Sequence, residues 1–129
     1  MYVINNRLAT HGLPQGNLYM SYNECEIGHH LGFRIVDVRP MMDDCTVKDK
    51  EYLLNISRVI SYLQCGENVV VCCSAGISRS NSIALGVLVK YFKMDFYDAW
   101  ELVKEKVPIA DCDPCHIAAL KRIFHVTIP

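Results

Sequence analysis

The stretch that most constrains the fold is the apolar run VVVCC at 69–73, which leads into a short loop and then a helix. Three successive β-branched valines without polar alternation are typical of a strand covered on both faces inside a parallel sheet. After the loop, apolar residues return at helical spacing from position 79 or 80 onward. They are Ile83, Ala84, Val87, Leu88 and Tyr91. A strand, a loop and a helix in this order predict an α/β fold.

The rest of the chain continues the alternation of strands and helices, and no repeat, low-complexity tract or linker interrupts it. The predicted elements are a strand at 17–20, a helix that follows Asn23 and ends at Gly32, a strand at 33–38 and a helix at 47–63. Thr46 and Asp49 resemble a capping box at the start of the last helix. We expect residues 1–129 to form a single three-layer α/β domain, with a central, mostly parallel sheet of about four strands and helices on both faces.

Composition excludes several classes of protein. Hydrophobic residues make up 51%, charged residues 21%, and the net charge is -1, which argues against disorder and against a polybasic nucleic-acid surface. The longest strongly apolar run, 83–89, is too short to span a bilayer, and the N-terminal residues do not resemble a secretory signal. Seven cysteines without such a signal are expected to be thiols. We therefore expect a cytoplasmic domain without nucleic-acid or membrane partners.

The loop after the valines carries the candidate chemistry. In open α/β sheets, ligands bind beyond the carboxyl ends of the strands, where the next helix offers free N–H groups and its positive dipole end. Arg79 can stabilise a thiolate at Cys73 and bind phosphate oxygens bidentately. The intervening residues can wrap an anion with backbone N–H groups, and Gly76 permits a close backbone approach. These candidate substrate-binding residues are Ser74, Ala75, Gly76, Ile77, Ser78 and Arg79.

The pattern C-x-x-G-x-x-R-S at 73–80 resembles the signature loop of cysteine-dependent protein phosphatases, specifically the compact dual-specificity type. The similarity extends from about Leu18 to Phe124. The segment SAGISRSNSIALGVLVKYFKMDFYDAWELVKEKVPI resembles the loop, the buried helix and the following helix of that family almost without gaps. The bare motif would be a weak signal, but a strand, the loop serine and a helix in the right order strengthen it.

The resemblance implies a general acid on a loop about thirty residues before the cysteine. Asp43 and Asp44 lie at the matching place. Aligning the next helix by Tyr52 and Leu53 puts Asp43 in the acid position, and Asp44 is the alternative because one deletion in the loop moves the match.

The resemblance also implies the reaction. Cys73 would attack phosphorus and form a phosphocysteine, while the aspartate first protonates the leaving oxygen and later activates water. Arg79 and the loop N–H groups would stabilise the equatorial oxygens, and Ser80 would hydrogen-bond the departing thiolate. The implied substrates are proteins phosphorylated on tyrosine, with serine and threonine as further candidates, and neither a metal nor a cofactor is needed.

Two other functions stay open. One is a phosphate-binding module with weak catalysis, and the other is a phosphatase for RNA 5′ ends or phosphoinositides. Residues 74–78 contain no Lys or Arg, which disfavours polyanionic substrates.

Two departures from the family pattern concern the loop. Cys72 stands where the family usually has histidine, and ADCDP at 110–114 stands where it commonly has a proline and an asparagine that support the loop. Adjacent strand side chains point to opposite faces, so we expect Cys72 to pack inward and Cys73 to open to the loop.

A possible metal pattern lies near the C-terminus. Cys112, Cys115 and His116 have ligand-like spacing, but a structural zinc site needs another ligand. Asp113 and Pro114 instead predict an N-cap and the first position of a helix.

Overall fold

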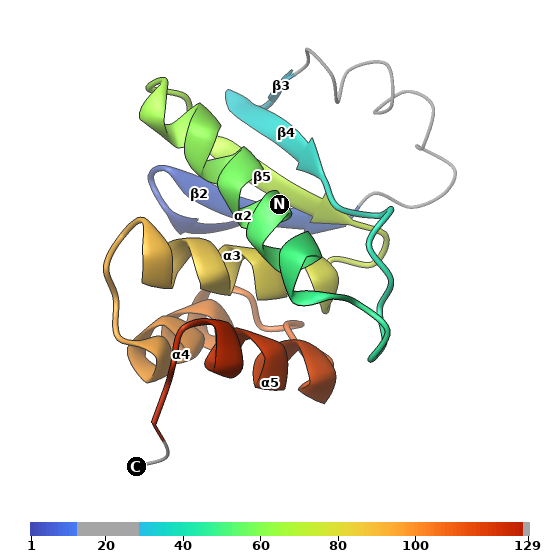
Figure 1. Cartoon of the computed structure of the whole chain (residues 1–129). Helices are drawn as coiled ribbons and strands as arrows, with labels where there is room; N and C mark the ends of the chain where they lie inside the picture. Colours follow the sequence, from blue (N-terminus) through green and yellow to red (C-terminus); the bar gives the residue numbers. More distant parts are fainter. Residues whose placement is uncertain (13–28, 128–129) are drawn as a thin grey trace.

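The computed structural model describes residues 1–12 and 29–127 (Figure 1). In these residues five strands form one sheet in the order β1-β2-β5-β4-β3. The strands are β1 (Tyr2–Asn5), β2 (Leu8–Gly12), β3 (His29–His30), β4 (Phe33–Asp37) and β5 (Val69–Cys73). The central strand β5 is parallel to both of its neighbours, β2 and β4, whereas the edge strands β1 and β3 pair antiparallel. The predicted α/β fold is confirmed.

The helices of the described residues lie over one face of the sheet. They are α2 (Asp49–Gln64), α3 (Arg79–Lys90), α4 (Phe96–Lys106) and α5 (Pro114–Ile123). α3 lies between the sheet and the pair α4 and α5, and α2 lies beside α3 (Figure 1). Residues 80–88 of α3 are all buried. The loop between β5 and α3 is therefore attached at both ends to core elements. None of these helices combines the length and the apolar character that crossing a membrane requires.

Alternate residues of β5 face two different apolar clusters. Val71 and Cys73 belong to the main core, together with residues of all four described helices. Cys72 belongs to a smaller cluster on the opposite face, which includes Ala9 and Ile35. All five residues of β5 are buried, as expected for a strand without polar alternation. The two adjacent cysteines point to opposite faces, which confirms the expected inward packing of Cys72.

The structure differs from the sequence prediction at the first helix. Residues 29–30 form β3, and Leu31 and Gly32 follow it with positive φ angles of 53° and 85°, so no helix ends at Gly32. A tight turn that joins β3 to β4 replaces the helix end. The rest of that helix and the strand expected at 17–20 lie outside the described residues, so a helix on the second face stays a prediction.

The start of α2 is a second difference. α2 begins at Asp49, and the expected capping box of Thr46 and Asp49 is wrong. The Thr46 hydroxyl and N–H both donate to Oδ1 of Asp44. The N-cap is Lys48, whose N–H lies 3.5 Å from Oε1 of Glu51. The Asp44 side chain thus binds Thr46, the residue that was expected to cap the helix.

Close packing of α3 against α2 depends on a glycine. A Cβ at Gly86 would lie 2.3 Å from Cδ1 of Ile56, a fully buried residue. Alanine is better than glycine by about 1 kcal/mol inside a helix, but overpacking a core costs about 1–3 kcal/mol. We predict that Gly86→Ala lowers the free energy of unfolding by about 1 kcal/mol, measured by urea denaturation.

The matched background is Ile56→Val, which removes the clashing Cδ1. In that background Gly86→Ala is expected to cost less, because the 2.3 Å contact with Cδ1 is gone and the 3.0 Å contact with Cγ1 remains. Equal costs of Gly86→Ala in both backgrounds would show that Ile56 is not the limiting contact.

Candidate active site

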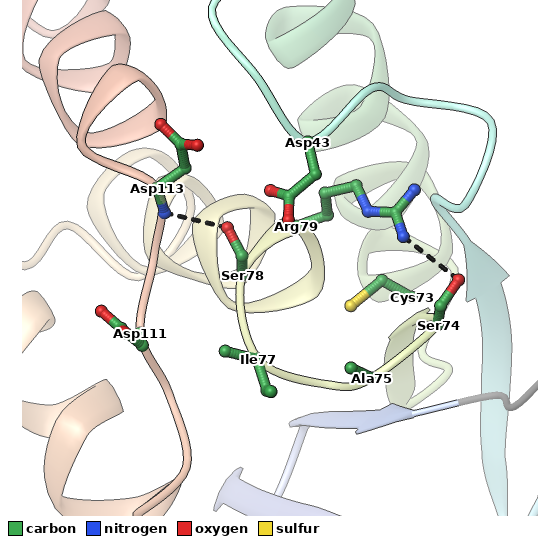
Figure 2. A pocket seen from close by; sticks show the side chains of 9 residues that line it. All are labelled: Asp43, Cys73, Ser74, Ala75, Ile77, Ser78, Arg79, Asp111 and Asp113. Atoms are coloured by element: carbon green, nitrogen blue, oxygen red, sulfur yellow. Dashed lines mark hydrogen bonds between the residues drawn. The ribbon is translucent and has the colours of Figure 1, made fainter.

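A pocket of about 250 Å³ lies at the C-terminal end of β5. Three segments of the chain line it, and Figure 2 shows their side chains around the hollow. The lining residues are Asp43, Cys73, Ser74, Ala75, Ile77, Ser78, Arg79, Asp111 and Asp113. We call residues 74–78 the cradle loop, residues 38–48 the acid loop and residues 110–113 the brace segment. The pocket brings the candidate nucleophile, the candidate arginine and one of the two candidate acids together.

Two glycines set the path of the cradle loop. Gly76 has a φ of 73°, and a Cβ there would lie 2.9 Å from the backbone nitrogen of Gly12. A Cβ on Gly12 would in turn lie 2.9 Å from the carbonyl carbon of Ala75. The loop therefore passes directly over the end of β2, and neither position has room for a side chain. The close approach expected at Gly76 is present, whereas its partner Gly12 carries no local signal in the sequence.

Cys73 lies at the base of the pocket, with 2% of its surface exposed. Its Sγ is 3.2 Å from Oγ of Ser80, which is fully buried in the first turn of α3. A thiol can donate to this hydroxyl, and the hydroxyl can donate to a thiolate. The geometry therefore provides a donor for an ionised sulfur.

Arg79 joins the cradle loop to the acid loop. Its Nη1 donates to the carbonyl oxygens of Arg39 and Met41, at 2.8 and 2.9 Å. Its Nη2 donates to Oγ of Ser74 at 3.1 Å (Figure 2). A guanidinium held on two sides presents a fixed positive charge beside Cys73, where an oxyanion would bind.

The brace segment supports the cradle loop from the side. The N–H of Asp111 donates to the carbonyl of Ile77 at 3.0 Å, and the N–H of Asp113 donates to Oγ of Ser78 at 2.9 Å. Cys112 Sγ lies 3.6 Å from the carbonyl oxygen of Ser78. This sequence thus supports its loop with backbone N–H groups, although it lacks the proline and asparagine that the family pattern commonly has there.

Polar residues at the start of α3 support the loop from below. Asn81 is fully buried, and its Nδ2 donates to the carbonyls of Gly76 and Ile77 at 2.9 and 3.0 Å. The Ser82 hydroxyl donates to the carbonyl of Ser78 at 2.8 Å. The sequence reasoning did not assign either residue to the site. The available signal was the polar run SNS at the start of an otherwise apolar helix.

The two candidate acids are placed differently. Asp43 lines the pocket, and 46% of its side chain is exposed. Asp44 turns into its own loop, where hydrogen bonds from the Thr46 hydroxyl and N–H lower the pKa of the Asp44 carboxyl. Asp44 is therefore better suited to closing a turn than to donating a proton.

A buried histidine contacts Asp43 from behind the pocket. Nε2 of His116 lies 2.9 Å from Oδ1 of Asp43, and Nδ1 lies 2.5 Å from the hydroxyl of Tyr52. His116 is fully buried, and its ring meets that of Tyr52 edge to face. Burial raises the pKa of Tyr52 to about 12, and the charge of Asp113 adds to this effect. Asp43, His116 and Tyr52 form a continuous chain of hydrogen bonds.

The three residues with ligand-like spacing do not converge on a metal. His116 binds Asp43 and Tyr52, and Cys112 faces the cradle loop, where burial raises the pKa of its thiol to about 12. Asp113 is the N-cap of α5 with Pro114 at its first position, as predicted. Asp113 also has an oxygen within 4.8 Å of two cysteine sulfurs, but those sulfurs are bonded to each other and are not thiolate ligands.

Cys45 of the acid loop and Cys115 of α5 form that disulfide, with Cα atoms 5.2 Å apart. The expectation that the cysteines are all thiols is therefore wrong. The pair is separated by 70 positions, and only the packing of α5 against the acid loop brings it together. Within the described residues, Cys65, Cys73 and Cys112 are free thiols. The disulfide ties the backbone of the acid loop two residues from Asp43.

Comparison with known proteins gives a consistent result. The family described as "Dual specificity phosphatase, catalytic domain" matches residues 17–123. Tyrosine-protein phosphatase pmp1 of Schizosaccharomyces pombe is 26% identical over 85 residues, which are 62% of this chain and 31% of pmp1. The chain therefore spans about a third of the length of that curated relative.

Solved structures show the same fold. The crystal structure of human DUSP28 matches with a TM-score of 0.78 at 15% identity, over 97% of this chain and 96% of DUSP28. A mouse putative dual specificity phosphatase, complexed with zinc tungstate, matches with a TM-score of 0.77 at 16% identity, over 96% of this chain and 86% of the mouse chain.

The disulfide generates a stability prediction. Closing a loop of 70 residues stabilises a fold by about 4 kcal/mol in the chain-entropy model. We predict that the double variant Cys45→Ser, Cys115→Ser loses a free energy of unfolding of that order under oxidising conditions, measured in urea. Cys65→Ser, at an exposed free cysteine, is the control and is expected to have no effect. Alkylation of both Cys45 and Cys115 in the unreduced, unfolded protein would contradict the pairing.

Proposed function

The chain belongs to the dual-specificity phosphatase catalytic-domain family, and we propose that it hydrolyses phosphotyrosine in proteins through a phosphocysteine on Cys73. Phosphoserine and phosphothreonine are further proposed substrates. The observation that carries the proposal is that Asp43 lines the same pocket as Cys73 and Arg79. Asp43 and Cys73 are 30 positions apart in the sequence.

In the first step, the thiolate of Cys73 attacks phosphorus and the bond to the leaving oxygen breaks. Asp43 gives its proton to that oxygen, which departs as the hydroxyl of the substrate side chain. Arg79 and the N–H groups of the cradle loop stabilise the charge on the three remaining oxygens. The fixed guanidinium and the glycine-shaped loop support this step, because neither has to reorganise when the transition state forms.

In the second step, water attacks the phosphocysteine. Asp43, now ionised, takes a proton from this water, and phosphate leaves while the bond to sulfur breaks. The departing thiolate accepts a hydrogen bond from Ser80, whose Oγ lies 3.2 Å from the sulfur. The enzyme then returns to its starting state with Asp43 protonated.

The pocket also bears on the substrate class. Among the described residues, its lining contains three aspartates and a single cation, Arg79, which is unfavourable for RNA ends and polyphosphorylated lipids. Ile77, 39% exposed, offers an apolar contact at the pocket. These features favour a single phosphoryl group on a protein side chain. The cytoplasmic location proposed from the sequence stays a prediction.

A phosphate-binding module without turnover is the alternative proposal. Such a module requires the cradle loop and Arg79 but has no use for a carboxylate across the pocket. The position of Asp43 therefore favours catalysis.

The nucleophile can be tested with two adjacent substitutions. We predict that Cys73→Ser abolishes hydrolysis of p-nitrophenyl phosphate but still binds tungstate, because the cradle loop and Arg79 remain. Cys72→Ser is the matched control and should retain most of the activity, since Cys72 lies on the opposite face of β5. The assignment fails if Cys72→Ser is the inactive variant.

The general acid can be tested with the neighbouring aspartates. Asp43→Asn is expected to slow the turnover of a phosphotyrosine peptide by about 10²-fold or more, because general acid catalysis contributes that much. The loss should be much smaller for an aryl phosphate with an acidic leaving group, which needs little protonation. Asp44→Asn is the control, and a larger loss from it than from Asp43→Asn would reverse the assignment.

A further inference from the structure

We propose that His116 is a positioning residue for the general acid: it binds Oδ1 of Asp43 and so restricts the catalytic proton to Oδ2, the oxygen left for the substrate. This inference rests on the proposed function, in which Asp43 is the acid. It adds a second element, because nothing in the loop motif or in the expected acid position assigns a role to His116 or to Tyr52.

The contact geometry is suited to positioning. Asp43 lies on a loop with 46% of its side chain exposed, whereas the His116 ring that meets it is fully buried. The 2.9 Å distance between Nε2 and Oδ1 is that of a good hydrogen bond. An exposed side chain that could occupy several rotamers is thus tied to a fully buried ring that Tyr52 also binds.

The two partners of His116 together select its tautomer. Oδ1 of an ionised Asp43 can only accept, so Nε2 must donate to it. The hydroxyl of Tyr52, whose pKa burial raises to about 12, keeps its proton and can donate to Nδ1. A neutral imidazole that accepts at Nδ1 carries its proton on Nε2. The N–H at Nε2 then points at Oδ1 of Asp43, which must act as the acceptor.

The same tautomer serves both steps of the proposed reaction. While Asp43 is protonated, Oδ1 accepts from Nε2 and the acid proton resides on Oδ2. After that proton has moved to the leaving oxygen, Oδ1 still accepts from Nε2 and Oδ2 is the base for water. The opposite tautomer would place a bare Nε2 against Oδ1 and attract the acid proton away from the pocket. That arrangement is disfavoured because it loses the hydrogen bond from Nε2 to the ionised carboxylate.

Two other contacts of the acid loop do not replace this role. The disulfide from Cys45 to Cys115 fixes the backbone beside Asp43, and Arg79 binds the carbonyls of Arg39 and Met41. Neither contact touches the Asp43 carboxyl. Within the described part of the chain, the hydrogen bond from His116 is the contact that acts on the carboxyl group itself.

A matched pair of variants tests the proposal. In His116→Gln the amide nitrogen can reach the position of Nε2 and still donate to Asp43, whereas in His116→Asn the shorter amide reaches only toward Tyr52. We expect kcat for phenyl phosphate to be lower in the Asn variant than in the Gln variant by a factor of about ten or more. On an aryl phosphate with an acidic leaving group, the two variants should differ by less than about threefold, with similar KM values.

Both variants remove the same buried ring, so urea unfolding of each measures the structural cost separately. Equal kcat for the Asn and Gln variants on phenyl phosphate would overturn the proposal, as would a loss in the Asn variant that is independent of the leaving group. Tyr52→Phe is a third variant, and it should also lose more activity on phenyl phosphate than on the activated substrate.

A spectroscopic measurement keeps the inference testable if the protein turns over no phosphate ester at all. That result would reject the proposed function, but the imidazole nitrogens of His116 can still be observed by ¹⁵N NMR in the wild-type protein. We expect the tautomer with the proton on Nε2, and a change in the Nε2 signal in Asp43→Asn. A proton on Nδ1, or no response to Asp43→Asn, would overturn the positioning role whatever the activity.

Discussion

Burial of β5 and of the first turns of α3 is the constraint on which the rest of the structure depends. β5 is buried over its whole length, and α3 is buried from residue 80 to residue 88. The five residues between them are fixed at both ends, and their buried backbone groups need hydrogen-bond partners close by. Asn81 and Ser82 provide these partners from below, and the N–H of Asp111 in the brace segment provides one from the side. A rigid anion cradle results from satisfying backbone groups at the edge of a core.

The acid loop is held against the pocket by a different set of contacts, three of which are long-range. Arg79 binds its carbonyls, the disulfide joins it to α5, and His116 holds the Asp43 carboxyl. The first two contacts fix the backbone and the third fixes a side chain. Catalysis by charge stabilisation works best when dipoles and charges are in place before the reaction begins. The acid loop is thus held by contacts to distant segments, whereas the cradle loop is held by its close approach to β2, by α3 and by the brace segment.

The sequence predicts well whatever is determined by neighbours along the chain. The valine run, the helical spacing after it and the pair of Asp113 and Pro114 are local signals, and the strand, α3 and the start of α5 follow from them. The start of α2 was predicted wrongly because two local patterns competed for Thr46. β1 and β2 are short and are separated only by Asn6 and Arg7, so their pattern is weak and the sequence did not predict them. Gly12, the disulfide and the contact between His116 and Asp43 depend on packing between distant segments, which periodicity does not reveal.

The cysteine that replaces the usual histidine before Cys73 can be interpreted in the same physical terms. Cys72 lies on the far face of β5 among Ala9, Ile35 and Val70, and its Sγ faces the carbonyl of Val70 at 3.9 Å. A small, weakly polar thiol fits this apolar cluster without the hydrogen-bond partners that an imidazole would need there. The substitution therefore changes the face of the strand that is away from the pocket. On the pocket side, Ser80, Arg79 and the N-terminus of α3 are in place to hold a thiolate whichever residue occupies position 72.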